Sequence, residues 1–401
     1  MVGICPLSNP IREYAWGSRS AIAELLGQPV PSPGPQAEIW MGAHPSDPSR
    51  ARCGDGWVPL PELLRKDPTG VLGEAVAARF DGELPFLFKV LAVGQPLSIQ
   101  AHPNREQARA GFDRESAQGI ALDARERNYR DPHPKPELLC AISPFSALCG
   151  FRPVLETAEA FRAFRVEAFA TEIKALECAA EQTALEPLIA AVLSADGDRL
   201  ALAIEQAATG AERRSADPVA RWITALASLY PGDAGVLAPL FLNLVTLAPG
   251  EAMYLAAGGL HSYLEGVGIE IMGNSDNVLR GGLTAKHVDV RELCRVLRFE
   301  PGEAEILLPR EVSPGERVFE TPADEFELAV ITVAEGEPWR SARSRGVEIL
   351  LAIEGVVAIT DRGVGESFTL ERGASVLIPD SVECYELGGR GVAYRAGVPR
   401  G

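Results

Sequence analysis

The sequence predicts a mainly β protein that is interrupted by one α-helical segment. Its 401 residues include 39 Gly and 31 Pro, which favour many short strands joined by tight turns over a helical bundle. Short apolar runs alternate with such turns up to about residue 151 and again after Gly232. Between them lies an Ala-rich, nearly Gly-free stretch with apolar residues three and four positions apart, which indicates amphipathic helices. This length allows two or three domains.

The strands and helices of each region are predicted from its own residues. The N-terminal strands are predicted from the runs "AEIWMGAHPSDP", "LPFLFKVLAVGQPLSIQAHP" and "KPELLCAISPFSALCGF". In the helical segment, Asp217-Pro218 is expected to begin a further helix that ends by "YPGD". The β pattern resumes in "MYLAAGGLHSYLEGVGIEIMGNSDNVLRGGL", and the last hundred residues have the strand and turn cadence of a small antiparallel jelly-roll barrel. This second barrel has no His or Glu cluster, so we expect it to be structural.

Charge and cysteine usage exclude several classes of protein. The formal net charge is −17 and the pI is near 4.9, which argues against nucleic-acid binding. No apolar run approaches the roughly 18 residues that would span a membrane, and "MVGICPLSNPIREYAWG" lacks the pattern of a signal peptide. The seven cysteines are scattered without a C-x-x-C. We therefore expect a cytoplasmic protein with reduced thiols and no cysteine zinc knuckle.

The stretch "PLSIQAHPN" places Ser98, Gln100 and His102 at every second position. In a strand these side chains project from one face, and the apolar side chains between them project from the other. If the polar face points into a barrel, burying it is costly unless a metal or ligand satisfies it. If it points outward, it meets solvent as on many antiparallel sheets. This stretch alone leaves both alternatives open.

Three other segments carry polar residues in or beside apolar runs. These residues are Lys89 in "PFLFKVLAV", Lys135 and Glu137 in "DPHPKPELLCAI", and His261, Tyr263, Glu270, Asp276 and Arg280 in the long segment that follows Ala256. Two imidazoles, one carboxylate and one carboxamide oxygen suit a borderline divalent ion such as zinc. The candidate metal ligands are therefore Gln100, His102, Glu137 and His261.

At these residues the chain resembles type I mannose-6-phosphate isomerase (phosphomannose isomerase), a zinc enzyme family of the cupin superfamily. The resemblance covers most of the chain and rests on "YAWGS", "AEIWMGAHP", "ELPFLFKVLAVGQPLSIQAHPN", "RNY" followed by "KPEL", and "HSYLEGVGIEIMGNSDNVLRGGLTAK". It implies a catalytic cupin (jelly-roll) barrel at 1–151 and 232–298, a helical insertion domain at 152–231 and a second, cupin-like β barrel at 299–401. It also implies a monomer with one Zn²⁺ per chain and a phosphosugar substrate.

The resemblance further implies roles for individual residues. The family's zinc ligands fall on Gln100, His102, Glu137 and His261. Its substrate pocket falls on Trp16, Lys89, Ser98, Lys135, Tyr263, Glu270, Asp276, Arg280 and Lys286. The chain departs from the family at Pro134, where a His usually precedes the Lys, with His133 one position earlier. It departs again at Ala285, where the family has Pro.

The implied reaction interconverts mannose 6-phosphate and fructose 6-phosphate by moving a proton between C2 and C1 through an enediol. Zinc would polarise the O1/O2 pair of the sugar, and Arg280 would support the enediolate or the phosphate. Lys89, Ser98 and Lys135 are expected to form a basic island for the phosphate. Glu270 is the candidate base, because burial between two isoleucines would raise its pKa toward neutrality. The alternatives are Asp276 and a zinc-bound hydroxide.

We assign catalysis to Arg280, Glu270, Asp276 and Lys135, and substrate binding to Trp16, Lys89, Ser98, Tyr263 and Lys286. The structural alternatives are an edge-strand Lys89 whose amine reaches solvent, and core aromatics at Trp16 and Tyr263. At the level of function, the alternatives are an iron-dependent cupin oxygenase, a sugar-binding cupin without catalysis, and an isomerase of a related sugar or sugar phosphate.

Overall fold

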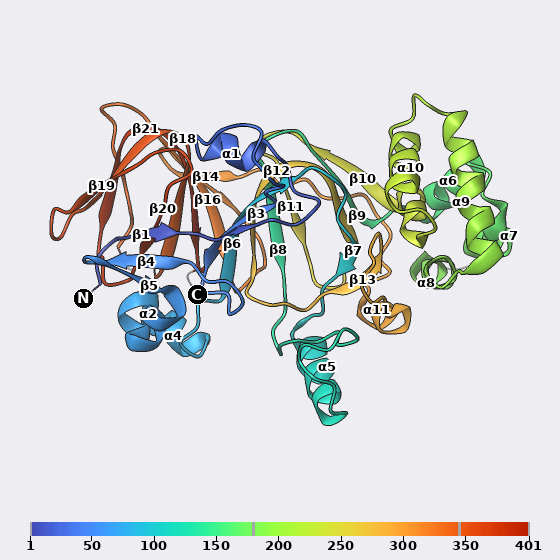
Figure 1. Ribbon diagram of the computed structural model, residues 1–401, viewed down its shortest axis with the longest axis horizontal. Helices are drawn as coiled ribbons and strands as arrows, with labels where there is room; N and C mark the ends of the chain where they lie inside the picture. The colour runs from blue at the N-terminus through green and yellow to red at the C-terminus, as the bar shows by residue number, and fades with distance from the viewer. Residues whose placement is uncertain (1, 179–180, 344–345, 400–401) are drawn as a thin grey trace.

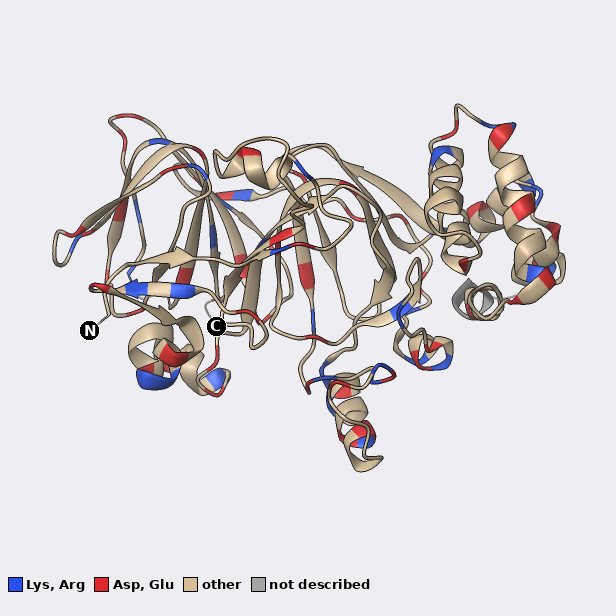
Figure 2. Cartoon of the chain, viewed as in Figure 1, with Lys and Arg blue, Asp and Glu red and all other residues tan. Residues whose placement is uncertain are grey.

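Two antiparallel β-sheets lie side by side, with a group of helices at one end of the molecule (Figure 1). The computed structural model describes residues 2–178, 181–343 and 346–399. The protein is therefore mainly β with helices, as the short apolar runs and turns predict. Acidic and basic residues are interspersed along the helices at the end of the molecule (Figure 2).

The first sheet carries most of the polar residues singled out in the sequence. Its strands are β2 (Ile11–Arg12), β3 (Glu38–Gly42), β6 (Phe86–Val93), β7 (Ile99–Ala101), β8 (Glu137–Ala141), β9 (Phe145–Phe151), β10 (Leu242–Leu247), β11 (Ala252–Leu255), β12 (His261–Gly273) and β13 (Leu279–Gly282). Strand β12 pairs with β9 and β7 near its start and with β6 and β8 along its second half. This one long strand therefore brings four others around it.

The helical segment lies between β9 and β10 and shares one apolar core with strands of the first sheet. Its helices are α6 (Val154–Ala163), α7 (Ala170–Cys178), α8 (Glu181–Leu193), α9 (Gly197–Glu212) and α10 (Pro218–Leu229), with 3₁₀ turns η1 (Glu167–Phe169) and η2 (Ala234–Leu240). The Asp217 carboxylate accepts a hydrogen bond from the Val219 backbone amide and caps α10. The prediction that a helix begins at Asp217-Pro218 is confirmed.

The second sheet is built mainly from the C-terminal residues. Its strands are β14 (Arg310–Ser313), β15 (Glu316–Phe319), β16 (Glu327–Val333), β17 (Trp339–Arg340), β18 (Glu348–Asp361), β19 (Ser367–Leu370), β20 (Ser375–Ile378) and β21 (Tyr385–Gly397), joined by β1 (Cys5–Ser8), β4 (Arg50–Cys53) and β5 (Gly56–Pro59). The last three differ from the expectation that residues 1–151 lie wholly in the first barrel. Strand β1 pairs with β20 through its first half and with β4 through its second half.

One apolar core joins the two sheets. It includes Phe86 and Phe88 of the first sheet and Ile349 and Leu351 of the second, all buried. The remaining helices are α1 (Ala21–Leu25), α2 (Leu60–Lys66), α3 (Pro68–Leu72), α4 (Glu74–Arg79), α5 (Arg105–Ala117) and α11 (Val290–Val296). Within the part of the chain that the structure describes, no helix has the length and apolar character needed to cross a membrane.

Candidate metal centre and active-site cavity

The polar face of "PLSIQAHPN" points into the molecule. The apolar residues of β7, Ile99 and Ala101, are fully buried in the core of the helical segment, so the opposite face is directed away from the helices. His102 on that face is only 2% exposed, while Ser98 and Gln100 line a cavity of about 720 Å³. The alternative in which this face simply meets solvent is therefore wrong.

Three buried ligands converge beside this cavity. The ligand atoms of His102, Glu137 and His261 all lie within 4.8 Å of one another. His102 Nε2 lies 3.3 Å from Glu137 Oε1, and His261 Nε2 lies 3.2 Å from Glu137 Oε2. Glu137 begins β8 and His261 begins β12, so the first residues of two strands deliver these side chains. Segments more than a hundred residues apart thus meet at one point.

Backbone carbonyls fix the tautomers of both imidazoles. His102 Nδ1 lies 2.7 Å from the Asn277 carbonyl oxygen, and His261 Nδ1 lies 3.0 Å from that of Gly259. Because a carbonyl only accepts, each Nδ1 carries the proton, and each Nε2 presents a lone pair toward the carboxylate. Burial lowers the pKa of His102 to about 4, which keeps this ring neutral at physiological pH. A metal ligand requires this same neutral form.

The nitrogen and oxygen atoms at the centre of this cluster lack hydrogen-bond donors in the described part of the chain. Both Nε2 atoms and Glu137 Oε2 are buried without a hydrogen-bond partner in the described part of the chain. Unpaired buried polar atoms are destabilising, and a lone pair that faces a carboxylate is repelled by it. A divalent cation would satisfy all three atoms at once, so these residues fit a metal ion.

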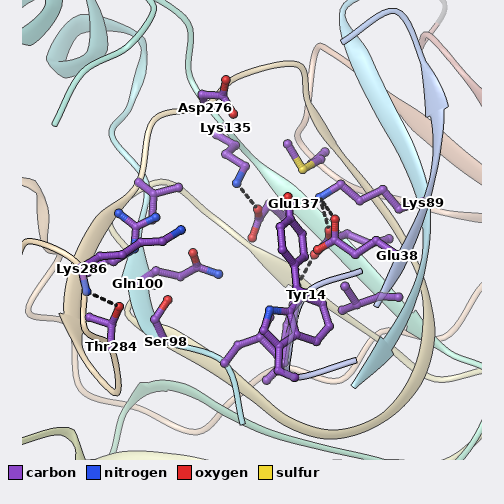
Figure 3. Close-up of a pocket in the computed structure, with 18 of the residues that line it drawn as sticks. Tyr14, Glu38, Lys89, Ser98, Gln100, Lys135, Glu137, Asp276, Thr284 and Lys286 are labelled. Atoms are coloured by element: carbon purple, nitrogen blue, oxygen red, sulfur yellow. Dashed lines mark hydrogen bonds and ion pairs between the residues drawn. The ribbon is translucent and has the colours of Figure 1, made fainter. Parts of the chain in front are cut away.

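Lys135 lies at the same carboxylate. Its Nζ is 3.1 Å from Glu137 Oε1, and Figure 3 shows the two side chains meeting at the back of the cavity. Burial alone would raise the pKa of Glu137, but neighbouring groups, the charge of Lys135 among them, lower it well below its usual range. Glu137 is therefore ionised, as a metal ligand must be.

Gln100 stands beside the cluster through strand register. It pairs directly with His261 on β12 and with Arg280 on β13. Residues paired across antiparallel strands project from the same face, with Cβ atoms about 4.5–5.5 Å apart. The carboxamide of Gln100 therefore lies in a row between the His261 imidazole and the Arg280 guanidinium, beside the three buried residues.

A second buried cluster surrounds Lys89. Trp40, Lys89 and Glu270 are paired across β3, β6 and β12 and share one face. Lys89 Nζ lies 3.0 Å from Glu270 Oε2 and 3.9 Å from Glu38 Oε2. Burial alone would lower the pKa of Lys89, but the charges of Glu270, Glu38 and Glu137 raise it above its usual value. Lys89 is thus a buried cation held between carboxylates, and the edge-strand alternative is wrong.

Glu270 is buried as expected, but it is not isolated. The Tyr263 hydroxyl donates to its Oε1 at 2.8 Å, and Lys89 contacts its other oxygen. Burial, together with the charge of Glu270, raises the pKa of Tyr263 well above its usual value, so this hydroxyl keeps its proton. A cation and a hydroxyl donor therefore hold both carboxylate oxygens of Glu270, which the sequence interpretation did not foresee.

The other candidate base, Asp276, is more open. Its side chain is 53% exposed, and His44 Nε2 lies 3.4 Å from its Oδ1. The hydrogen bond with His44 is the main cause that lowers the pKa of Asp276. Asp276 therefore stands at the mouth of the cavity, next to a histidine to which the sequence had given no role.

The basic island expected at Lys89, Ser98 and Lys135 must also be revised. Both lysines already have a carboxylate partner, Glu270 for Lys89 and Glu137 for Lys135. The cations without such a partner lie elsewhere in the cavity. In residues 2–178, 181–343 and 346–399, no carboxylate lies within 4.0 Å of a side-chain nitrogen of Arg130, Arg280 or Lys286.

These three cations act on one another. The pKa of Lys286 is lowered by burial and by the charges of Arg280 and Arg130, and that of Arg280 is lowered by burial and by Arg130. Their mutual repulsion would be relieved by an anion. Figure 3 shows Lys286 on one side of the cavity and Lys89 with Glu38 on the other, with Gln100 and Glu137 between them.

The cavity brings most of the predicted site residues together. Its lining includes Trp16, Lys89, Ser98, Gln100, Lys135, Glu137, Tyr263, Glu270, Asp276, Arg280 and Lys286. His102 and His261 lie buried beside Glu137. The lining also contains residues that the sequence interpretation missed, namely Tyr14, Glu38, Trp40, His44 and Arg130. Of these, Glu38 could have been predicted as a site residue, because it is a charged residue in the apolar run "AEIWM", just as Lys89 is in the run "PFLFKVLAV".

His133 lies outside this cavity. Its side chain is exposed and lines a different hollow with Arg79, Arg105 and Glu325. Its backbone carbonyl accepts hydrogen bonds from the Ser275 hydroxyl and the Asn277 amide. The imidazole of His133 therefore lies outside the site.

Comparison with known proteins adds to this geometry. The family model for the catalytic domain of type I phosphomannose isomerase matches residues 4–154. Mannose-6-phosphate isomerase of Escherichia coli K12 is 42% identical over 353 residues, covering 87% of this chain and 88% of the relative. The human enzyme of that name is 33% identical over 407 residues, covering 94% and 93%.

Two solved structures are similar to this chain over almost its whole length. Mannose 6-phosphate isomerase from Salmonella typhimurium, bound to its substrate fructose 6-phosphate and to zinc, has a TM-score of 0.91 and 37% identity, covering 99% of this chain and 100% of that one. A zinc-bound mannose 6-phosphate isomerase has a TM-score of 0.90 and 36% identity, with the same coverage.

Proposed function

The chain belongs to the type I phosphomannose isomerases, and we propose that it interconverts mannose 6-phosphate and fructose 6-phosphate at the cavity described above. It is a zinc-dependent aldose–ketose isomerase. The observation that carries this assignment is the pair of buried imidazole lone pairs aimed at the Glu137 carboxylate. Family membership also favours this function over an iron oxygenase or a binding protein without catalysis.

Gln100, His102, Glu137 and His261 would hold the zinc ion. When bound, zinc supplies a positive charge that polarises the sugar oxygens at C1 and C2 and stabilises negative charge on them. The carbonyls of Asn277 and Gly259 keep both imidazoles in the orientation this requires. Lys135, beside Glu137, is placed to hydrogen-bond the same sugar oxygens.

The phosphate binds at the side of the cavity formed by Arg130, Arg280 and Lys286. A dianion there relieves the mutual repulsion of the three cations and gains charge-assisted hydrogen bonds. Ser98 lines the same cavity and adds a hydroxyl donor. Because Arg280 is paired with Gln100, its guanidinium also lies close enough to the metal ligands to support the enediolate.

Glu270 takes the proton from C2 and returns one to C1. Its carboxylate lines the cavity, and Lys89 and Tyr263 hold it in one orientation, which favours transfer at a defined position. Trp16 and Trp40 line the same space and reduce its access to water. Asp276 and a zinc-bound hydroxide are the alternatives that an experiment must separate from Glu270.

The sheet topology supports a division of the chain into domains. We assign the first sheet to a catalytic cupin barrel, α6–α10 to an inserted helical domain and the second sheet to a cupin-like barrel without a metal centre. Strands β1, β4 and β5 belong with the last of these. The protein is proposed to act as a cytoplasmic monomer with one zinc ion per chain.

The test is turnover of mannose 6-phosphate in a coupled assay, together with washout of deuterium from the C2 position. The wild type should lose activity with chelator and regain it with zinc, and His261→Ala should lose it permanently. His133→Ala is the matched control, because this histidine is exposed outside the cavity. Turnover that is unaffected by chelator and by His261→Ala would refute the assignment, as would faster turnover of unphosphorylated mannose.

Glu270→Gln and Asp276→Asn identify the base. Loss of a general base lowers the rate about 10²- to 10⁴-fold. We expect this loss, and the loss of C2 deuterium washout, in Glu270→Gln alone. The reverse pattern would assign the proton transfer to Asp276.

A further inference from the structure

Two cysteines face one another in a second cavity. The Sγ atoms of Cys5 and Cys53 lie 3.7 Å apart. Cys5 is buried and Cys53 is half-buried, and both line a cavity of about 790 Å³ that shares no lining residue with the active-site cavity. The reaction proposed above gives these thiols no role.

The backbone already suits a bond between the two sulfur atoms. Strands β1 and β4 are antiparallel, with Leu7 opposite Ala51 and Ser8 opposite Arg50. This pairing ends at Leu7 and Ala51, and the same register extended by two residues would set Cys5 opposite Cys53. Paired Cα atoms on antiparallel strands lie about 4.5–5.5 Å apart, within the range of about 4.4–6.8 Å found across disulfides. Joining the sulfur atoms therefore requires side-chain rotation and no rearrangement of strands.

We propose that Cys5 and Cys53 form a reversible redox site, which a small disulfide such as oxidised glutathione converts to an intramolecular disulfide. The Cys53 thiolate attacks one sulfur of the small disulfide, forms a mixed disulfide and releases one thiolate. The Cys5 thiolate then attacks Cys53 Sγ and releases the second. In total, two protein thiols and one small disulfide give one protein disulfide and two small thiols, so electrons and protons balance.

The order of attack follows from exposure, because Cys53 is the more accessible thiol. Burial and the neighbouring Cys53 raise the pKa of Cys5 to about 12, so its thiolate is scarce at neutral pH and ring closure should accelerate as pH rises. The charged groups that line this cavity are Arg52, Lys66, Glu62, Asp67 and Glu366.

The bond would fasten the N-terminal strand to the β4–β5 hairpin. It would close a loop that contains β3 and therefore Glu38 and Trp40 of the active-site cavity. Because β1 and β4 are neighbours in the second sheet, the disulfide would join two adjacent strands of that sheet. A cross-link of this kind constrains the unfolded chain, so the oxidised protein should melt at a higher temperature and retain its isomerase activity.

The test exposes the full-length protein to oxidised glutathione at pH 7 and pH 8.5, alkylates the remaining thiols and maps peptides by mass spectrometry without reduction. We expect a linked peptide containing Cys5 and Cys53 that is lighter by two hydrogens, forms faster at pH 8.5 and is reversed by dithiothreitol. In the Cys5→Ser variant, the reaction should end at the mixed disulfide between glutathione and Cys53. Cys178→Ser, which changes an exposed cysteine, should behave as the wild type.

The exposed Cys178 of the same sample shows whether the conditions are oxidising enough, because it should carry glutathione. If it does and Cys5 and Cys53 are both recovered in alkylated form, the proposal is overturned. A stable mixed disulfide on Cys53 of the wild type would overturn it as well, since Cys5 would then fail to resolve it. The readout is independent of isomerase activity and of zinc, so this result and the result for the proposed function can be told apart.

Discussion

Replacement of Lys89 by Met tests the buried charge cluster beside the metal centre. The Lys89 side chain is 8% exposed, and the carboxylates of Glu270 and Glu38 are 4% and 9% exposed. Lys89→Met keeps most of the apolar stem but removes the amine that lies between them. Two buried carboxylates then remain without their cation, each retaining one donor, from Tyr263 and from Trp40 respectively.

Breaking a buried ion pair by removing one partner costs about 3–5 kcal/mol of folding free energy. The two retained donors place the expected loss near the lower end, at about 3 kcal/mol. The pH dependence also has a defined sign. The folded-state pKa of Lys89 is raised, so its contribution is complete below the unfolded pKa of about 10.4 and declines as pH rises toward the folded value. The difference between wild type and variant should therefore shrink by about 1 kcal/mol between pH 7 and pH 11.

The assay is urea unfolding of the zinc-free protein, followed by tryptophan fluorescence, at both pH values. Lys66→Met is the matched control, since Lys66 is exposed on α2 and such changes stay within about 0.5 kcal/mol. Lys89→Met combined with Glu270→Gln should recover part of the loss, because the second change removes one unpaired charge. A loss below about 1 kcal/mol at pH 7, or one that is equal at pH 7 and pH 11, would refute the reasoning.

Three further substitutions have defined outcomes. Glu137→Gln removes the charge at the centre of the metal site. Bound zinc, measured by elemental mass spectrometry, should be lost, and turnover should fall by more than about 100-fold. Retention of one zinc per chain would contradict this. Lys286→Met removes one charged phosphate contact. In steady-state kinetics, the KM for mannose 6-phosphate should rise by about 10- to 150-fold, with no loss of zinc. An unchanged KM would exclude Lys286 from the phosphate site. Asp217→Ala removes the cap of α10 and should lower the free energy of unfolding by about 1 kcal/mol in urea titrations; an unaltered transition would show that this cap adds nothing.

The four residues proposed as metal ligands could be selected from sequence because each is a polar residue placed where strands are apolar. Gln100 and His102 alternate with buried Ile99 and Ala101, and Glu137 and His261 each begin a buried strand. Such residues need a partner when they are buried, and their chemistry limits that partner to a metal or a ligand. Glu38 satisfies the same criterion and could have been found by it.

The pairing of charges could not be predicted in the same way. The sequence assigns Lys89 and Lys135 to the phosphate because they are cations in or beside apolar runs, yet both lie against carboxylates. Strand pairing across a long sequence separation decides the partner of Lys89, which is Glu270 on β12. It also decides the position of β1, whose short pattern fits either sheet and which pairs with β20 more than 350 residues away.

Anomalous diffraction at the zinc absorption edge, from crystals grown without added metal, tests the central claim most directly. We expect one peak per chain, bonded to His102 Nε2, His261 Nε2 and oxygens of Glu137 and Gln100, with Zn–N distances of about 2.0–2.1 Å. The absence of a peak at this cluster after zinc is added back, or a peak bound by other residues, would contradict it.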